Sequence, residues 1–73
     1  MNLAEPIALP SATLTSAAYD APHSILLLEF RTGATYQYFQ VPPAIYQELL
    51  SAPSKGQYFN RRIRDQFLCS RLP

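Results

Sequence analysis

The sequence predicts one small α+β domain with the element order β-β-β-α-α-β, in which an antiparallel sheet packs on two short helices. The first half holds short runs of β-branched, aliphatic and aromatic residues between turn residues, which is typical of strands. The second half holds apolar residues at helical spacing after a pair of prolines. A chain of 73 residues can bury one modest core, and its 48% hydrophobic content is that of a globular protein.

Strands alternate with turns through the first part of the chain. Residues 1–10 contain Pro6 and Pro10 without a clear period, so we expect an irregular tail there and one domain over residues 11–73. Aspartate, proline and glycine between the runs supply the turn chemistry. The expected strands are residues 13–19, 24–31, 35–41 and, at the end of the chain, 67–72.

Tyr36 and Tyr38 lie on the same face of their strand, and the hairpin register decides which face that is. With a three-residue turn, Phe30 lies opposite Tyr36 and Leu28 opposite Tyr38, so that apolar residues pair and the rings face the core. With a two-residue turn, Glu29 meets Tyr36 and the rings are exposed, where sheet-borne aromatics can stack RNA bases. The pairing favours buried rings and keeps an exposed aromatic contact as the alternative.

Two helices are expected after the sheet. Proline suits the first turn of a helix, so the first helix should run from Pro43 to about Leu50. Ser54 and Gln57 have the spacing of a capping box, so a second helix should begin there and run to about Asp65. The expected core residues are Leu28, Phe30, Ile45, Leu49, Phe59 and Ile63.

Charge is distributed unevenly along the chain. Residues 54–73 carry five basic residues and one acidic residue, a balance of +4, whereas residues 1–53 carry one arginine and four acidic residues, a balance of −3. Such asymmetry indicates either contact with a polyanion or an ordinary solvated helix face. Helical spacing places Arg61 and Arg64 opposite Phe59 and Ile63. The candidate nucleic-acid contacts are Lys55, Tyr58, Arg61, Arg62 and Arg64, with Tyr36 and Tyr38 as further aromatic candidates.

The residue types needed for catalysis or metal binding are sparse. His23 is the only histidine and Cys69 the only cysteine, so no zinc-ligand spacing and no disulfide framework is present. We expect Cys69 to be a small buried residue and His23 an exposed turn residue. Nothing in the sequence indicates a glycine-rich phosphate loop, a cofactor, a metal, a signal peptide or a membrane span. We therefore expect a cytoplasmic protein that is not an enzyme.

A series of short motifs is spread over most of the chain, from about Ser11 to Phe67. The motifs are Tyr19-Asp20, the strand Leu26/Leu28/Phe30, Gly33 with Tyr36 and Tyr38, Val41-Pro42, Tyr46, Leu49-Leu50, Ser54-Lys55-Gly56, Tyr58-Phe59-Asn60 and Ile63-Arg64. Together they resemble the KTSC domain, a short bacterial domain found at the C-terminus of some lysyl-tRNA synthetases and as a stand-alone protein. The chain departs from the family pattern at Ala18, where glycine is usual, and in the last strand, where a Tyr-x-Tyr-like pattern is usual.

The resemblance implies an accessory binding domain without catalysis of its own, and attachment to synthetases suggests RNA. Together with the basic second helix, this favours an RNA-binding or tRNA-binding module. The alternative is a protein-interaction module that uses the outer sheet face or an unpaired edge strand such as Thr13–Tyr19.

Overall fold

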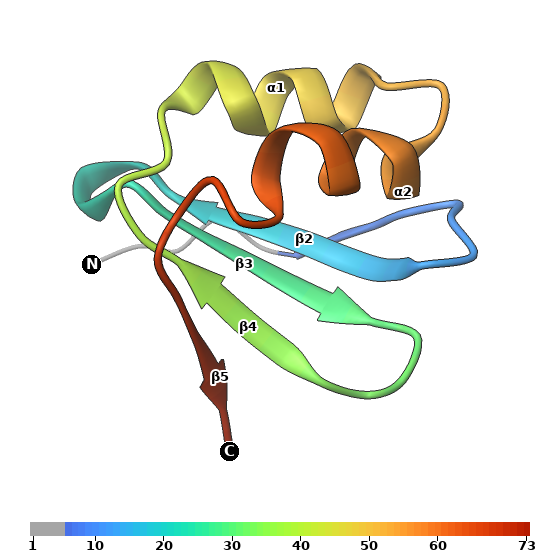
Figure 1. The fold of residues 1–73 in the computed structure, drawn as a ribbon, viewed down its shortest axis with the longest axis horizontal. Coiled ribbons are helices and arrows are strands. Elements are labelled where there is room, and N and C mark those ends of the chain that lie inside the picture. Colours follow the sequence, from blue (N-terminus) through green and yellow to red (C-terminus); the bar gives the residue numbers. More distant parts are fainter. Residues whose placement is uncertain (1–5) are drawn as a thin grey trace.

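In the described part of the chain, five strands form one antiparallel sheet in which each strand lies beside its neighbours in sequence, in the order β1-β2-β3-β4-β5. The computed structural model describes residues 6–73. Within them, both helices lie on the same face of the sheet (Figure 1). The predicted α+β class is confirmed. The elements are β1 (Ile7–Ala8), β2 (Leu14–Asp20), a 3₁₀ turn (Ala21–His23), β3 (Ile25–Phe30), β4 (Thr35–Tyr38), α1 (Pro43–Ser51), α2 (Lys55–Tyr58), a π-helical turn (Phe59–Ile63) and β5 (Cys69–Leu72).

The register of the β3–β4 hairpin differs from the expected one by two residues. Leu28 lies opposite Tyr36 and Leu26 opposite Tyr38, whereas we expected Phe30 and Leu28 in those places. A shift of two residues leaves every side chain on its expected face, because side chains alternate along a strand. The preference for buried rings is therefore confirmed for Tyr38, which is 5% exposed, while Tyr36 is half-buried.

The turn itself explains the shift. The Phe30 amide donates to the Ala34 carbonyl at 2.8 Å, which leaves a three-residue loop of residues 31–33 instead of 32–34. The third residue of such a loop adopts a left-handed conformation that glycine tolerates best. Gly33 fills this position with a φ of 94°. The loop length was predicted correctly, but the conformational requirement of Gly33 places the loop one residue earlier.

The core lies between the sheet and the helices. Of the six residues expected there, four are buried, and Phe30 and Ile45 pack against them partly buried. The aromatic rings of Phe59, Phe30 and Tyr38 meet edge to face at centroid distances of 5.2 and 6.0 Å. The buried core comprises Leu9, Leu14, Ala17, Tyr19, Leu26, Leu28, Tyr38, Val41, Tyr46, Leu49, Phe59 and Ile63.

The N-terminal segment corrects two expectations. The tail expected to be irregular contains β1, whose Ile7 and Ala8 pair with Ala17 and Ser16 of β2. Residues 1–5 of that tail lie outside the described residues. We expected β2 to be a free edge strand, but β1 covers that edge. The two edge strands of the sheet are therefore β1 and β5. Pro6 and Pro10 made this strand hard to predict from the sequence, because proline restricts strand pairing and these prolines lie on both sides of a strand of only two residues.

The second helical segment begins where it was expected and ends earlier than expected. Ser54 Oγ accepts a hydrogen bond from the Gln57 amide at 3.3 Å, which confirms the predicted serine N-cap. The helix widens into the π turn, where the Arg64 amide donates to the Phe59 carbonyl at 2.8 Å. It ends at Ile63, before the predicted Asp65, because Arg64 leaves the helical conformation with a ψ of 130° and Asp65 follows with a φ of 63°.

The last strand also begins later than expected. Phe67 packs against the core instead of joining the sheet, and β5 begins at Cys69. Leu68, between them, is 80% exposed. Among residues 6–73, no helix is both long enough and apolar enough to cross a membrane.

Candidate nucleic-acid interface

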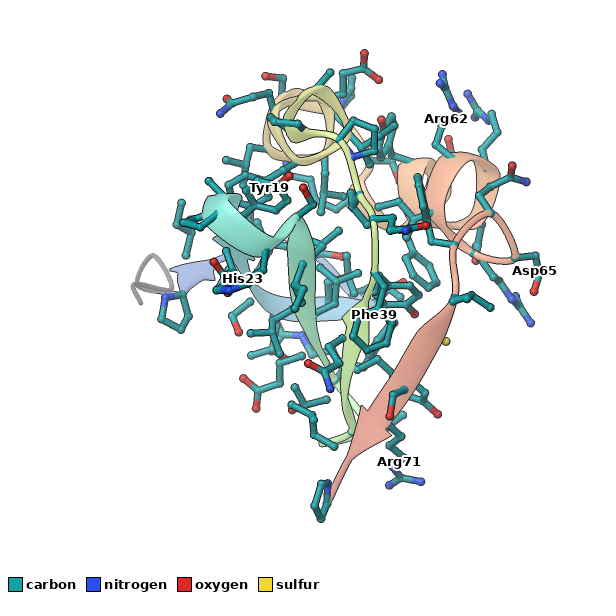
Figure 2. The ribbon with its side chains drawn as sticks, turned by 90° about the vertical axis from the view of Figure 1, so that its left-hand side faces the viewer. Tyr19, His23, Phe39, Arg62, Asp65 and Arg71 are labelled. Carbon is teal, nitrogen blue, oxygen red and sulfur yellow. The ribbon has the colours of Figure 1, made fainter. Side chains whose placement is uncertain are left out.

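Three arginines project from the end of the second helical segment, and we call Arg61, Arg62 and Arg64 the arginine turn. Phe59 and Ile63, from the same π turn, are buried and anchor it on the sheet. All three arginines are exposed, and Figure 2 shows Arg62 pointing away from the helical layer. Within residues 6–73 none of the three forms an ion pair with a carboxylate. The arginine turn therefore presents unneutralised positive charge to solvent.

Lys55 occupies a different environment from the one expected. Its Nζ donates hydrogen bonds to the carbonyl oxygens of Leu50 at 3.0 Å and Ala52 at 2.6 Å. These carbonyls belong to the end of α1, which lacks further helical partners for them. The ammonium group is thus used to close the junction between α1 and α2, and it is not presented alongside the arginine turn.

Gly56 and Ser54 complete this junction. A Cβ atom on Gly56 would lie 2.7 Å from Thr13 Oγ1, so the helix approaches the loop before β2 closer than any larger residue permits. Ser54 caps the helix, as described above. The Ser54-Lys55-Gly56 motif is therefore explained by packing and capping.

Tyr58 is held in place by a neighbouring carboxylate. Its hydroxyl donates to Glu48 Oε1 of α1 at 2.6 Å, and its ring packs partly buried against the core. Burial, followed by the hydrogen bond to Glu48 and the charge of that carboxylate, raises the pKa of Tyr58 to about 12. Tyr58 therefore offers a fixed ring with an already occupied hydroxyl.

A shallow pocket joins Tyr58 to the arginine turn. It has a volume of about 240 Å³. We call it the junction pocket, because it opens where α1 passes into α2. Its lining residues are Ala52, Pro53, Ser54, Gln57, Tyr58 and Arg61. Sequence analysis missed Pro53 and Gln57 as site residues, although the spacing of four between Gln57 and Arg61 indicates one helix face.

The two tyrosines of β4 do not line this pocket. Tyr38 is buried, and burial, with smaller contributions from Cys69 and Tyr36, raises its pKa to about 12. Tyr36 lies opposite Arg71 of β5, an arginine that sequence analysis did not include among the site residues. Cys69 is exposed on β5, which corrects the expectation that it is buried.

His23 has one acidic neighbour that the sequence did not reveal. Its Nδ1 lies 2.9 Å from Asp20 Oδ2 across the 3₁₀ turn, and Asp20 is 7% exposed. The His23 side chain itself is exposed, as expected. In the described part of the chain, no group of three or more histidine, cysteine or acidic side chains could hold a metal ion.

The fold and this surface define a small α+β domain in which a basic helical turn packs over a five-stranded sheet. A family model of the KTSC domain matches residues 10–67, and the chain belongs to this family. An uncharacterized protein of Stutzerimonas stutzeri is 45% identical over 60 residues, which cover 82% of this chain and 84% of that protein. A crystal structure of a KTSC domain protein from Yersinia pestis superposes with a TM-score of 0.92 at 35% identity, covering 94% of this chain and 97% of that one.

Longer relatives contain the same unit. Lysine–tRNA ligases from Nostoc punctiforme and from another Nostoc strain are 37% and 41% identical over 71 residues, which is 96% of this chain. The chain spans about 13% of the length of these ligases. The family resemblance inferred from the sequence motifs is confirmed.

Proposed function

We propose that this domain binds RNA, and specifically tRNA or a similarly structured RNA, through the arginine turn. The observation that carries the proposal is the exposure of Arg61, Arg62 and Arg64 without an ion-pair partner in residues 6–73. A protein that neutralises phosphates with arginine gains affinity from counterion release. Arginine also matches phosphate geometry with its planar fork of donors.

The relatives support an RNA partner. Two of them are lysine–tRNA ligases, proteins named for joining an amino acid to tRNA, and the matched segment makes up a small part of each. A basic domain attached to such an enzyme would hold the nucleic acid by its phosphates, which position a complex without reading its sequence. We propose a binding role without catalysis of its own.

The residues proposed for contact are fewer than the sequence alone suggested. Lys55 is left out, because its ammonium group already binds two backbone carbonyls. Tyr58 remains as a ring beside Arg61. Tyr36 remains as a half-buried ring beside Arg71, and Tyr38 contributes to the core.

A fluorescence-anisotropy titration with labelled tRNA and with a labelled single-stranded RNA at low salt tests the proposal. We expect the wild type to bind and an Arg61→Ala/Arg64→Ala variant to lose affinity while remaining folded, because exposed charges contribute about 0–1 kcal/mol to stability. Arg31→Ala is the matched control, because Arg31 is an exposed arginine that does not belong to the arginine turn. It follows β3, and its Nε donates a hydrogen bond to the Ser11 carbonyl. Equal binding by the double variant would refute the proposal.

A protein partner is the second candidate, because the sheet face opposite the helices carries no helix within residues 6–73 (Figure 1). That face is mixed in character: Leu27 lies beside Gln37, and Ser16 Oγ donates to Glu29 Oε1 at 3.1 Å. A protein contact there would depend only weakly on salt, whereas RNA binding would weaken steeply as salt rises. The salt dependence of any partner captured by the domain separates the two candidates.

A further inference from the structure

The junction pocket adds a second kind of contact to the arginine turn. We propose that this pocket holds one unpaired base of a single-stranded RNA segment while Arg61, at its wall, contacts an adjoining phosphate. The inference rests on the RNA binding proposed above and specifies the form of the RNA. It predicts that the domain prefers an unpaired strand, or an unpaired loop of a folded RNA, to a continuous duplex.

The size of the pocket limits what it can accept. Its volume of about 240 Å³ is below the roughly 300–1,000 Å³ of pockets that enclose drug-sized ligands. It is also open on one side, where Arg61 and Gln57 are exposed. One flat ring system with its sugar left outside suits these dimensions better than a whole cofactor. A base within a duplex could not enter, because it is stacked between its neighbours.

The lining offers the two kinds of contact that an unpaired base uses. The ring of Tyr58 and the apolar surface of Pro53 provide faces for stacking. The carboxamide of Gln57 carries both donors and an acceptor for a base edge. The Ser54 hydroxyl oxygen accepts a hydrogen bond from the backbone N–H of Gln57, so the hydroxyl hydrogen of Ser54 is available for donation to a ligand.

The fold holds these groups in place before any ligand arrives. The Tyr58 hydroxyl is bound to Glu48 of α1, which fixes the ring at the wall of the pocket. Lys55 Nζ is bound to the carbonyl of Ala52, another lining residue, at 2.6 Å. Preorganised groups lose less conformational entropy on binding. Ser54 and Lys55, which cap the helix ends at the junction, therefore also hold the walls of the pocket in place.

The charges around the pocket are compatible with a nucleotide. Arg61 lies in its wall. Burial raises the pKa of Tyr58, and the positive charge of Arg62 works against that rise. Glu48 is the neighbouring acidic group, and its Oε1 is occupied by the hydrogen bond from Tyr58. A phosphate would contact Arg61 at the rim of the pocket, and the uncharged base would contact the Tyr58 ring and the Gln57 carboxamide inside it.

The test compares a short fluorescein-labelled single-stranded RNA with the same strand annealed to its complement, by anisotropy against folded protein. We expect tighter binding of the single strand. Gln57→Ala should weaken that binding about five-fold, the effect of one lost hydrogen bond, and should leave the salt dependence unchanged. Gln47→Ala, at an exposed position of α1 outside the pocket, is the matched control and should bind as the wild type does.

Two further variants separate the ring from its hydroxyl. Tyr58→Phe keeps the ring and should retain affinity within about two-fold, whereas Tyr58→Leu should lose about five-fold or more, because base stacking is lost. Thermal unfolding checks that both variants fold. If Tyr58→Leu does not fold, Gln57→Ala decides, because surface substitutions rarely change stability by more than about 0.5 kcal/mol.

The outcomes distinguish this inference from the proposed function. Equal affinity for single strand and duplex, or wild-type binding by Gln57→Ala, overturns the base pocket. If Arg61→Ala/Arg64→Ala still loses affinity in that case, RNA binding stands without the pocket. If the wild type binds none of the single strand, the duplex and the labelled tRNA, RNA binding fails and the pocket assignment fails with it. If it binds the tRNA alone, RNA binding stands and the pocket assignment fails.

Discussion

Lys55 and Arg61 belong to the same helical segment, yet their charged groups meet opposite environments. Lys55 Nζ is enclosed by two carbonyls at the end of α1, whereas the Arg61 guanidinium stands in solvent beside the junction pocket. The cation of the first half therefore closes the junction between α1 and α2, and the cation of the second half is presented to solvent. Basic residues in a sequence count toward a binding surface only when the fold leaves them free.

The largest expected effect concerns the anchor beneath the arginine turn. Phe59 is buried and its ring contacts Phe30 and Tyr38. Phe59→Ala should lower the free energy of unfolding by about 3–5 kcal/mol, which would largely unfold a domain of this size. Circular dichroism during thermal unfolding measures this. A variant that melts at the wild-type temperature would show that the segment does not depend on this ring.

A pair of methionine variants compares the contributions of Lys55 and Arg61 to stability. Lys55→Met removes both hydrogen bonds to the end of α1 and should lower the free energy of unfolding by about 1–3 kcal/mol. Arg61→Met should change it by less than about 0.5 kcal/mol. Urea denaturation of both variants gives the two values, and equal losses would contradict the division of roles.

The close contact at Gly56 predicts a coupled pair of substitutions. Gly56→Ala should lower the free energy of unfolding by about 1 kcal/mol, because its Cβ would press on Thr13 and outweigh the better helix propensity of alanine. Thr13→Ala should relieve that contact, so the double variant should recover stability relative to Gly56→Ala alone. A double-mutant cycle by urea denaturation measures the coupling, and simple additivity would argue against the contact.

A smaller effect is expected at alkaline pH. The pKa of Tyr58 in the folded protein is about 12, above the unfolded value of about 10, so the folded state holds its proton more tightly. The resulting stability is complete below about pH 10 and is lost as the pH rises toward about 12. Tyr58→Phe should show a shallower decline in the free energy of unfolding over this range, with Tyr38 still contributing. An identical decline in both proteins would contradict the raised pKa of Tyr58 in the folded state.

The sequence was sufficient for the fold class, the strand faces and the serine cap, because periodicity and turn residues encode them locally. It was insufficient for β1, because a strand of two residues between prolines is too short to show the alternation that indicates a strand. It did not reveal the partners of the Lys55 ammonium group, because the carbonyls that bind it become available only where α1 ends. The pairing of His23 with Asp20 likewise depends on the 3₁₀ turn that brings them together.

The candidate interface was predicted in part. Helical spacing placed Arg61 and Arg64 away from Phe59 and Ile63, and the structure exposes both arginines. The junction pocket was not visible in the sequence, because its walls come from the end of one helix and the start of the next. Residue types indicate which groups are charged, whereas the packing of α1 against α2 determines which of them share a surface.

The salt dependence of RNA binding tests the central claim most directly. For single-stranded RNA, each phosphate contact contributes roughly 0.7 to the slope of log affinity against log salt. The slope for Arg61→Ala/Arg64→Ala should therefore be smaller than that of the wild type by about 1.4, with unchanged unfolding. An unchanged slope, or a wild type that does not bind RNA at low salt, would contradict the assignment of the arginine turn as an RNA-binding surface.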